Sequence, residues 1–124
     1  METNDTITAS YGTGAGGKKD DHGKAGWHLF IPRLMGGIVR VLMYGVNKYA
    51  PQSWQNVPNG TERYWSALFR HLVAMQDNHG NIDLNSLDIE SGLPHLWHAQ
   101  CNLYFLEYFR QKQFDIPITQ HIER

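Results

Sequence analysis

The sequence predicts an all-α protein. Three stretches carry apolar residues at helical spacing, and prolines, glycines and turn residues separate them. No stretch shows the alternation of apolar and polar residues that is typical of a strand. A chain of 124 residues fits one domain with a core, yet it is small enough that oligomerisation would stabilise it.

The first predicted helix runs from Pro32 to about Lys48, because proline suits a helix start and Pro51 blocks continuation. One broad face is apolar. The other stripe carries Arg33, Gly37, Arg40, Tyr44 and Lys48. Three cations and a phenol suit phosphate binding, and a solvated helix face is the alternative. The costly pair Gly36-Gly37 indicates close approach of a ligand or a backbone.

The second predicted helix begins after Thr61, a suitable N-cap, and ends at about Asn78. On its face Arg70 points away from the core, whereas His71 lies at the edge of the buried side. This histidine is either a core residue or part of a pocket.

The third predicted helix starts at Ser91 or Pro94 and ends at Gln113. Aromatic residues surround much of its circumference, which predicts a place at the centre of the domain or in a dimer interface. Cys101, within its apolar pattern, is expected to be a buried apolar residue and not part of a disulfide or zinc site.

The beginning of the third helix is the main candidate site. His95, His98 and Asn102 are spaced three and four residues apart, so they share one side of the helix. They could bind a transition metal, or hydrogen bond to a phosphate, a ribose or the preceding linker. Asp88 and Glu90 precede the helix, where carboxylates stabilise its N-terminus.

Two other segments hold candidate ligand-binding residues. Trp54, between two prolines, either fixes a loop to the core or stacks on a base. Lys18 and Lys24 lie in a Gly-rich arm, residues 1–26, that either closes over an anion or remains a solvated tail. The helical nucleotide-binding domain is expected at residues 27–113 and a C-terminal tail at residues 114–124.

Composition excludes several classes of function. A formal net charge of -1 argues against a nucleic-acid binder. The polar N-terminal residues do not resemble a signal peptide, and no stretch approaches the ~20 apolar residues of a membrane span. The sequence therefore predicts a soluble cytoplasmic protein with no nucleic-acid or membrane partner.

Several motifs resemble one phage family. The order Gly17-Lys18, Gly23-Lys24, Trp27, Lys48-Tyr49, Arg70-His71-Leu72 and the run from Asp88 to Asn102 is similar to that of phage-borne dATP/dGTP diphosphohydrolases, over roughly residues 16–108. The resemblance implies a MazG-like bundle of three or four helices, assembled as a homodimer or homotetramer. It also implies Mg²⁺ ligands within a first-helix motif P-E-A-L-x-E. This chain has Arg33 and Gly37 in place of the two glutamates.

These replacements favour nucleotide capture. An arginine in a ligand position repels Mg²⁺ and attracts phosphate, so we expect a protein without cofactor that sequesters a nucleotide, or an immune signal of the cyclic-nucleotide or ADP-ribose type. This last step rests on the family's phage association. The alternative is an active Mg²⁺-dependent dATP/dGTP diphosphohydrolase, with Asp88, Glu90, His95 and His98 as catalytic residues and the two acids as metal ligands. A helical dimer that has lost the pocket is a third possibility.

Overall fold

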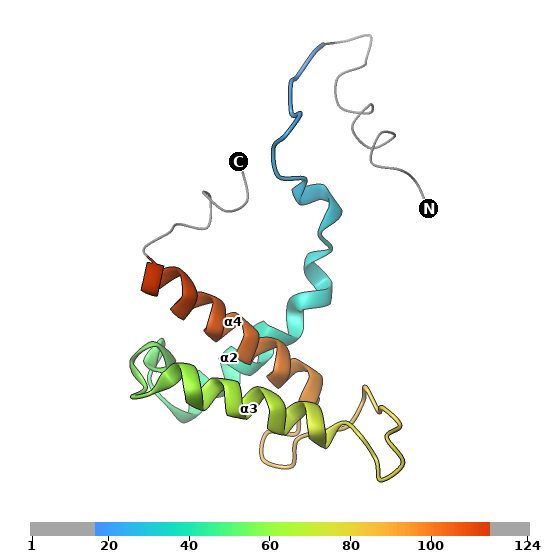
Figure 1. Ribbon diagram of the computed structural model, residues 1–124, viewed down its shortest axis with the longest axis vertical. Helices are drawn as coiled ribbons and strands as arrows, with labels where there is room; N and C mark the ends of the chain where they lie inside the picture. Colours follow the sequence, from blue (N-terminus) through green and yellow to red (C-terminus); the bar gives the residue numbers. More distant parts are fainter. Residues whose placement is uncertain (1–16, 115–124) are drawn as a thin grey trace. The chain divides into compact units, whose positions relative to one another are not determined.

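The structure is a computed structural model that describes residues 17–114. Its α-helices are α2 (Gly36–Lys48), α3 (Gly60–Ala74) and α4 (His95–Phe114). The short 3-10 helices are η1 (Trp27–Leu29), η2 (Pro32–Met35) and η3 (Ser53–Asn56). Within the described residues, strand pairing is limited to two isolated bridges, so the predicted all-α class is confirmed (Figure 1).

The chain divides into two compact units. One, the helical unit, is Ile31–Asp115, and the described part of the other is residues 17–30. In this second part the rings of Trp27 and Phe30 pack edge to face, with centroids 6.4 Å apart. Of the predicted arm and tail, residues 1–16 and 115–124 lie outside the described residues.

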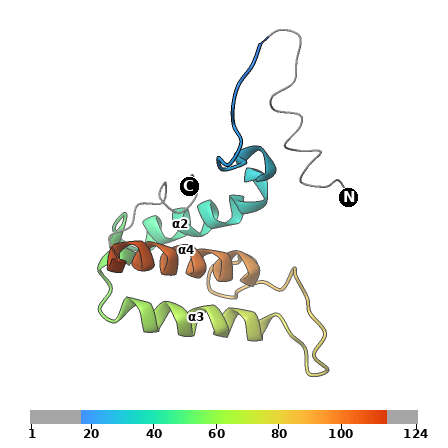
Figure 2. The same ribbon diagram turned by 45° about the horizontal axis from the view of Figure 1, so that its top comes forward.

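Helix α4 is the central element of the helical unit. It packs against both α2 and α3, and it lies between them in Figure 2. Each of the three helices contributes to the core, and so does the residue that follows α3. The described buried apolar residues are Ile38, Leu68, Met75, Ala99 and Cys101. Cys101 is only 1% exposed, and burial raises the pKa of its thiol to about 12. The predicted central place of this helix and the burial of Cys101 are confirmed.

The first predicted helix begins later than expected. Pro32 does open helical structure, but residues Pro32–Met35 form the 3-10 helix η2, and α2 starts at Gly36. Its end at Lys48 is as predicted, since Tyr49 is extended and Pro51 follows.

Both ends of the second predicted helix were wrong. Thr61 lies inside α3, and the N-cap is Asn59 in a left-handed conformation (φ 56°). The helix ends at Ala74 and not near Asn78. The reason is a competing turn, in which the Asp77 carboxylate accepts hydrogen bonds from the backbone N–H groups of His79 and Asn81 (2.8 and 2.9 Å).

The linker between α3 and α4 is held by further aspartate-centred turns. Asp83 accepts the N–H of Asn85 at 2.9 Å, and Asp88 accepts the N–H of Ser91 at 2.9 Å. The backbone N–H of His95 then donates to the Ser86 carbonyl, so α4 starts directly after Pro94, one of the two predicted positions.

Two glycines allow aromatic rings of α4 to approach the other helices. A Cβ at Gly37 would lie 2.3 Å from Cγ of Trp97, and one at Gly60 would lie 2.8 Å from Cζ of Phe109. Such separations are far inside van der Waals contact. The space beside Gly37 therefore belongs to an indole ring.

The aromatic residues of α4 also hold the loop after α2. The Trp54 ring stacks on Phe105 with centroids 4.4 Å apart, and it contacts Tyr108 edge to face at 4.9 Å. The Tyr64 hydroxyl donates to the Trp54 carbonyl at 3.1 Å. Trp54 thus fixes this loop to the helices. Among the described residues, no helix is both long enough and apolar enough to cross a membrane.

The Gly37 contact yields a stability prediction. Gly37→Ala is expected to lower the free energy of unfolding by about 1 to 3 kcal/mol, because the methyl group overpacks the contact with Trp97. Chemical denaturation followed by tryptophan fluorescence and circular dichroism measures this change.

Gly36→Ala is the matched control. A Cβ at Gly36 meets no atom within 4 Å, so this variant should be as stable as the parent, or more stable by up to ~1 kcal/mol. Equal effects of the two substitutions would contradict the packing role of Gly37.

Candidate functional site

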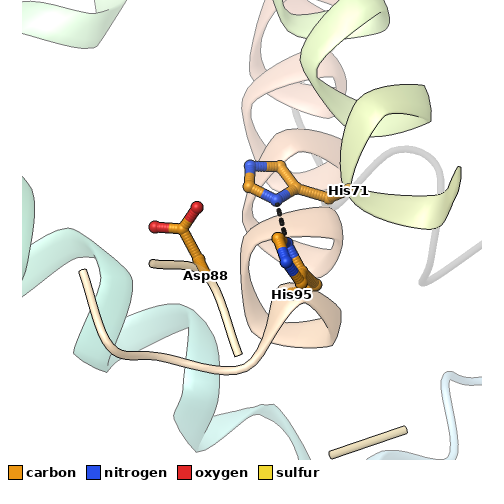
Figure 3. Close-up of side chains that lie close together, drawn as sticks. All are labelled: His71, Asp88 and His95. Atoms are coloured by element: carbon orange, nitrogen blue, oxygen red, sulfur yellow. Dashed lines mark hydrogen bonds between the residues drawn. The ribbon is translucent and has the colours of Figure 1, made fainter. Parts of the chain in front are cut away.

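Three histidines and one aspartate meet where α3, α4 and the linker come together. We call His71, Asp88, His95 and His98 the histidine cluster. The Nδ1 atoms of His71 and His95 are 2.8 Å apart, so one ring donates a hydrogen bond to the other (Figure 3). The rings of His71 and His98 stack at 4.6 Å with an interplanar angle of 10°. The spacing of the α4 histidines thus brings both against the same residue of α3.

Ser91 orients the acidic side of the cluster. Its hydroxyl donates to Oδ2 of Asp88 at 2.9 Å and accepts the N–H of Leu93 at 3.2 Å. The same oxygen lies 2.7 Å from Nε2 of His98. Since the hydroxyl proton is directed at Asp88, Nε2 of His98 is the donor in this last contact. This network assigns the proton of neutral His98 to Nε2.

The environment favours neutral imidazoles beside an ionised carboxylate. Burial, aided by the neighbouring His98 and His95, lowers the pKa of His71 to about 4. Burial also lowers the pKa of His98, although Asp88 opposes this shift. For Asp88, burial acts to raise the pKa, but the two hydrogen bonds from Ser91, together with the neighbouring His98 and His71, lower it overall.

A cavity of about 750 Å³ lies next to the histidine cluster. Its walls come from α2, the loop after it, α3, the linker and α4. Its charged and polar lining includes Tyr44, Lys48, Arg63, Arg70, Glu90 and His98, and its aromatic lining includes Tyr49, Trp54, Tyr64, Tyr104 and Phe105. His98 belongs both to this wall and to the cluster, so the two features are contiguous.

Glu90 ties the linker to the end of α2. Its Oε2 accepts hydrogen bonds from Nζ of Lys48 at 2.9 Å and from the hydroxyl of Tyr44 at 3.1 Å. These bonds lower the pKa of Glu90 and raise that of Lys48. The ion pair between Lys48 and Glu90 is exposed, so it contributes little stability, but it occupies the carboxylate of Glu90.

Comparison with known proteins assigns the family. The family described as dATP/dGTP diphosphohydrolase, N-terminal, matches residues 14–116. The chain belongs to this family. A protein named dATP/dGTP diphosphohydrolase from Salmonella phage PMBT28 is 36% identical over 90 residues, which are 73% of this chain and 28% of the phage protein. The chain thus spans less than a third of that relative's length. No solved structure matches it.

The structure brings together most of the predicted site residues of this diphosphohydrolase-family chain. Tyr44, Lys48, Trp54 and His98 line the cavity, and His71 and His95 lie beside it in the cluster. Asn102 is 6% exposed and donates to the carbonyl of His98 at 2.9 Å. Asn102 is therefore satisfied within its own helix. Ligand binding by these residues stays a prediction.

Only part of the predicted cationic stripe lines the cavity. Arg33 and Arg40 are exposed and do not line the cavity, whereas Tyr44 and Lys48 do. The prediction that Gly37 makes room for a ligand was wrong, because the ring of Trp97 fills that space. Lys18 and Lys24 belong to the other unit, so their predicted role as a lid stays a prediction.

Three residues of the site were missed. Arg63 and Arg70 line the cavity; Arg70 is exposed, as expected for a residue that points away from the core, but its place beside the cavity was not predicted. Ser91 was considered only as a helix start, although it organises Asp88 and His98. The motif Arg70-His71 was a usable signal, since one of its residues lines the cavity and the next joins the cluster.

The family's expected Mg²⁺ cofactor does not fit the residues present. Position 33 carries the guanidinium of Arg33, and position 37 is a glycine without a side chain. The carboxylate of Glu90 is bonded to Lys48. The group of described residues whose ligand atoms lie within 4.8 Å of one another is His71, Asp88 and His95. Two imidazoles and one carboxylate suit a transition metal better than Mg²⁺, which prefers oxygen ligands in octahedral geometry.

Acidification is expected to destabilise the fold through His71. An unfolded histidine binds a proton near pH 6.5, whereas folded His71 does so only near pH 4. Between these values the unfolded chain binds more protons, so the free energy of unfolding falls as the pH falls. Denaturant unfolding at pH values from 7.5 to 5, with a chelator present, measures how the free energy of unfolding changes with pH. This range lies above the one in which the carboxylates titrate.

His71→Gln should reduce this slope, because the glutamine cannot bind the proton. His79→Gln, in an exposed turn, should leave it unchanged. A His71→Gln variant with the parental slope would show that another group causes the acid sensitivity.

Proposed function

We propose that this chain binds a purine nucleoside triphosphate in the cavity between α2, α3 and α4. The cavity itself is the observation that carries the proposal. Its volume of about 750 Å³ lies within the range of ~300 to 1,000 Å³ that is usual for small-molecule sites. The substrates in the family's description, dATP and dGTP, support a purine ligand.

The cations of the cavity suit a polyphosphate. Lys48 comes from the end of α2, and Arg63 and Arg70 come from α3. Arginine binds phosphate through two parallel hydrogen bonds, and lysine contributes a compact charge. Because Lys48 also binds Glu90, a phosphate would compete with that carboxylate for the ammonium group.

The aromatic lining suits a base. Tyr44, Tyr49 and Tyr104 line the cavity. Stacking of a base on an aromatic side chain contributes ~1 to 3 kcal/mol and tolerates different bases. Trp54 lines the same cavity, but its ring is already stacked on Phe105, so it supports the wall.

We favour capture of the nucleotide without Mg²⁺-dependent hydrolysis. Among the described residues that line the cavity, Glu90 is the one carboxylate, and two hydrogen bonds occupy it. Reactions of phosphate esters on paired metal ions need several carboxylates to hold the metals. In a phage-infected cell, such a protein would act in the host cytoplasm and would keep a nucleotide, or a cyclic or ADP-ribose-type immune signal, from its receptor.

Hydrolysis with release of pyrophosphate is the second candidate. The name of the Salmonella phage relative supports it, and so does the contiguity of the histidine cluster with the cavity. Asp88, His95 and His98 would then be the residues nearest the phosphates. The relative is much longer than this chain, and its activity can depend on segments that this chain does not match.

Nucleotide chromatography before and after heat denaturation distinguishes the two candidates. The full chain is incubated with dATP, dGTP, ATP, a cyclic dinucleotide or ADP-ribose, with Mg²⁺ or with EDTA. Capture predicts that intact nucleotide leaves the filtrate and returns after denaturation in both conditions. Monophosphate and pyrophosphate would establish the enzyme, and unchanged filtrates would leave only a structural role.

Lys48→Ala is expected to weaken triphosphate binding by about tenfold to a hundredfold, since a charge-assisted hydrogen bond contributes ~1.5 to 3 kcal/mol. Lys112→Ala removes an equal charge from the exposed end of α4 and should bind as the parent does. Isothermal titration calorimetry gives both dissociation constants. Equal affinity of the two variants would place the phosphates elsewhere.

We also propose that the chain forms a homodimer or homotetramer. On α3 the side chains of Trp65, Phe69 and Val73 are 55%, 45% and 65% exposed, and they lie at helical spacing on the side away from α4. On α2, Val39 and Met43 are similarly exposed. Large exposed apolar patches mark interaction sites in soluble proteins, and these exposed apolar residues support self-association.

Phe69→Lys is therefore expected to shift the protein toward the monomer in sedimentation velocity, because a charge would be buried in the contact. Asn85→Lys adds the same charge in an exposed turn and should sediment as the parent does. A parent protein that is monomeric at all concentrations would refute self-association.

A further inference from the structure

We propose that His71, His95 and Asp88 form a binding site for a single transition-metal ion of the zinc class. The three residues come from α3, the first turn of α4 and the linker, yet one ligand atom of each lies within 4.8 Å of the others. All three are partly buried. Figure 3 shows the carboxylate of Asp88 beside the two imidazole rings. The site does not depend on nucleotide binding.

The chemistry of the three donors selects the ion. Neutral imidazole and carboxylate together bind Zn²⁺, Co²⁺ and related ions, and three protein ligands leave a further position for water or a substrate oxygen. Mg²⁺ would need almost exclusively oxygen ligands. The site therefore takes a different class of metal from the one that the family resemblance implies.

The two imidazole nitrogens are nearly at the separation of ligands on one ion. Two nitrogen ligands of a tetrahedral zinc ion, each at ~2.0 to 2.1 Å from the metal, lie roughly 3.3 Å apart. The two Nδ1 atoms are 2.8 Å apart and share a proton in a hydrogen bond. The rings must separate by about half an ångström and release that proton, which a change of side-chain torsion achieves.

Neighbouring groups already orient the acidic ligand. Ser91 donates two hydrogen bonds to Oδ2 of Asp88, from its N–H and its hydroxyl. Nε2 of His98 lies 3.8 Å from the same oxygen. Such partners fix ligand orientation in metal sites and leave the other carboxylate oxygen to the ion.

Metal titration of the full chain, without a histidine tag and freed of metal by a chelator, tests the proposal. Co²⁺ should bind with one equivalent per chain and give visible absorption of four- or five-coordinate cobalt. Zn²⁺ should displace it and raise the thermal midpoint, whereas excess Mg²⁺ should do neither. No nucleotide is present, so failure of nucleotide capture would not affect this result.

Three variants locate the site. His95→Ala should weaken Zn²⁺ binding by at least about tenfold and lower the cobalt absorption. Asp88→Asn keeps the size of the side chain and should have the same two effects. It provides the test if His95→Ala does not fold. His79→Ala removes an exposed histidine from a turn and should bind as the parent does. Parental affinity in both cluster variants, or no binding to the parent, would overturn the proposal.

Discussion

Helix α4 must be covered on opposite sides, and the arrangement of the helical unit depends on that requirement. Its aromatic rings fit against helix backbones where a side chain is missing. Trp97 packs on Gly37 of α2, and Phe109 packs on Gly60 of α3. Because a Cβ at either glycine would overlap a ring, the distances between the helices are set by these two contacts. The single buried thiol, Cys101, lies on the same helix.

The site follows from this packing. Once α4 lies against α3, the first turn of α4 brings His95 and His98 to His71. The linker supplies Asp88, which is placed by its own turn with Ser91 and not by a regular element. Rigid helices thus fix the imidazoles, while a short hydrogen-bonded turn fixes the carboxylate. A change in that turn would move the acid without moving the histidines.

Local sequence rules predicted a helix boundary correctly where one residue determines it. Pro51 ends the α2 region, and Pro94 precedes α4. They failed at the end of α3, where the Asp77 turn competes with further helix. They also failed for Gly37, since its partner is sixty residues away and no periodicity within α2 reports it. The spacing of His95 and His98 predicted that they share one side of α4. Their contact with His71 could not be predicted, because it depends on how two helices pack.

The position of Gly37 is linked to the packing of α2 against α4. A side chain at position 37 would have to displace the indole of Trp97, so a substitution there changes the helix contact as well as any ligand set. The proposed ion site lies in the histidine cluster, and the proposed phosphate site lies at Lys48 and the arginines of α3. His98 is common to both, because it contacts Ser91 and Asp88 and also lines the cavity. An ion that changes the position of His98 would change the affinity for a ligand in the cavity, and linkage requires that ligand to change the affinity for the ion by the same factor.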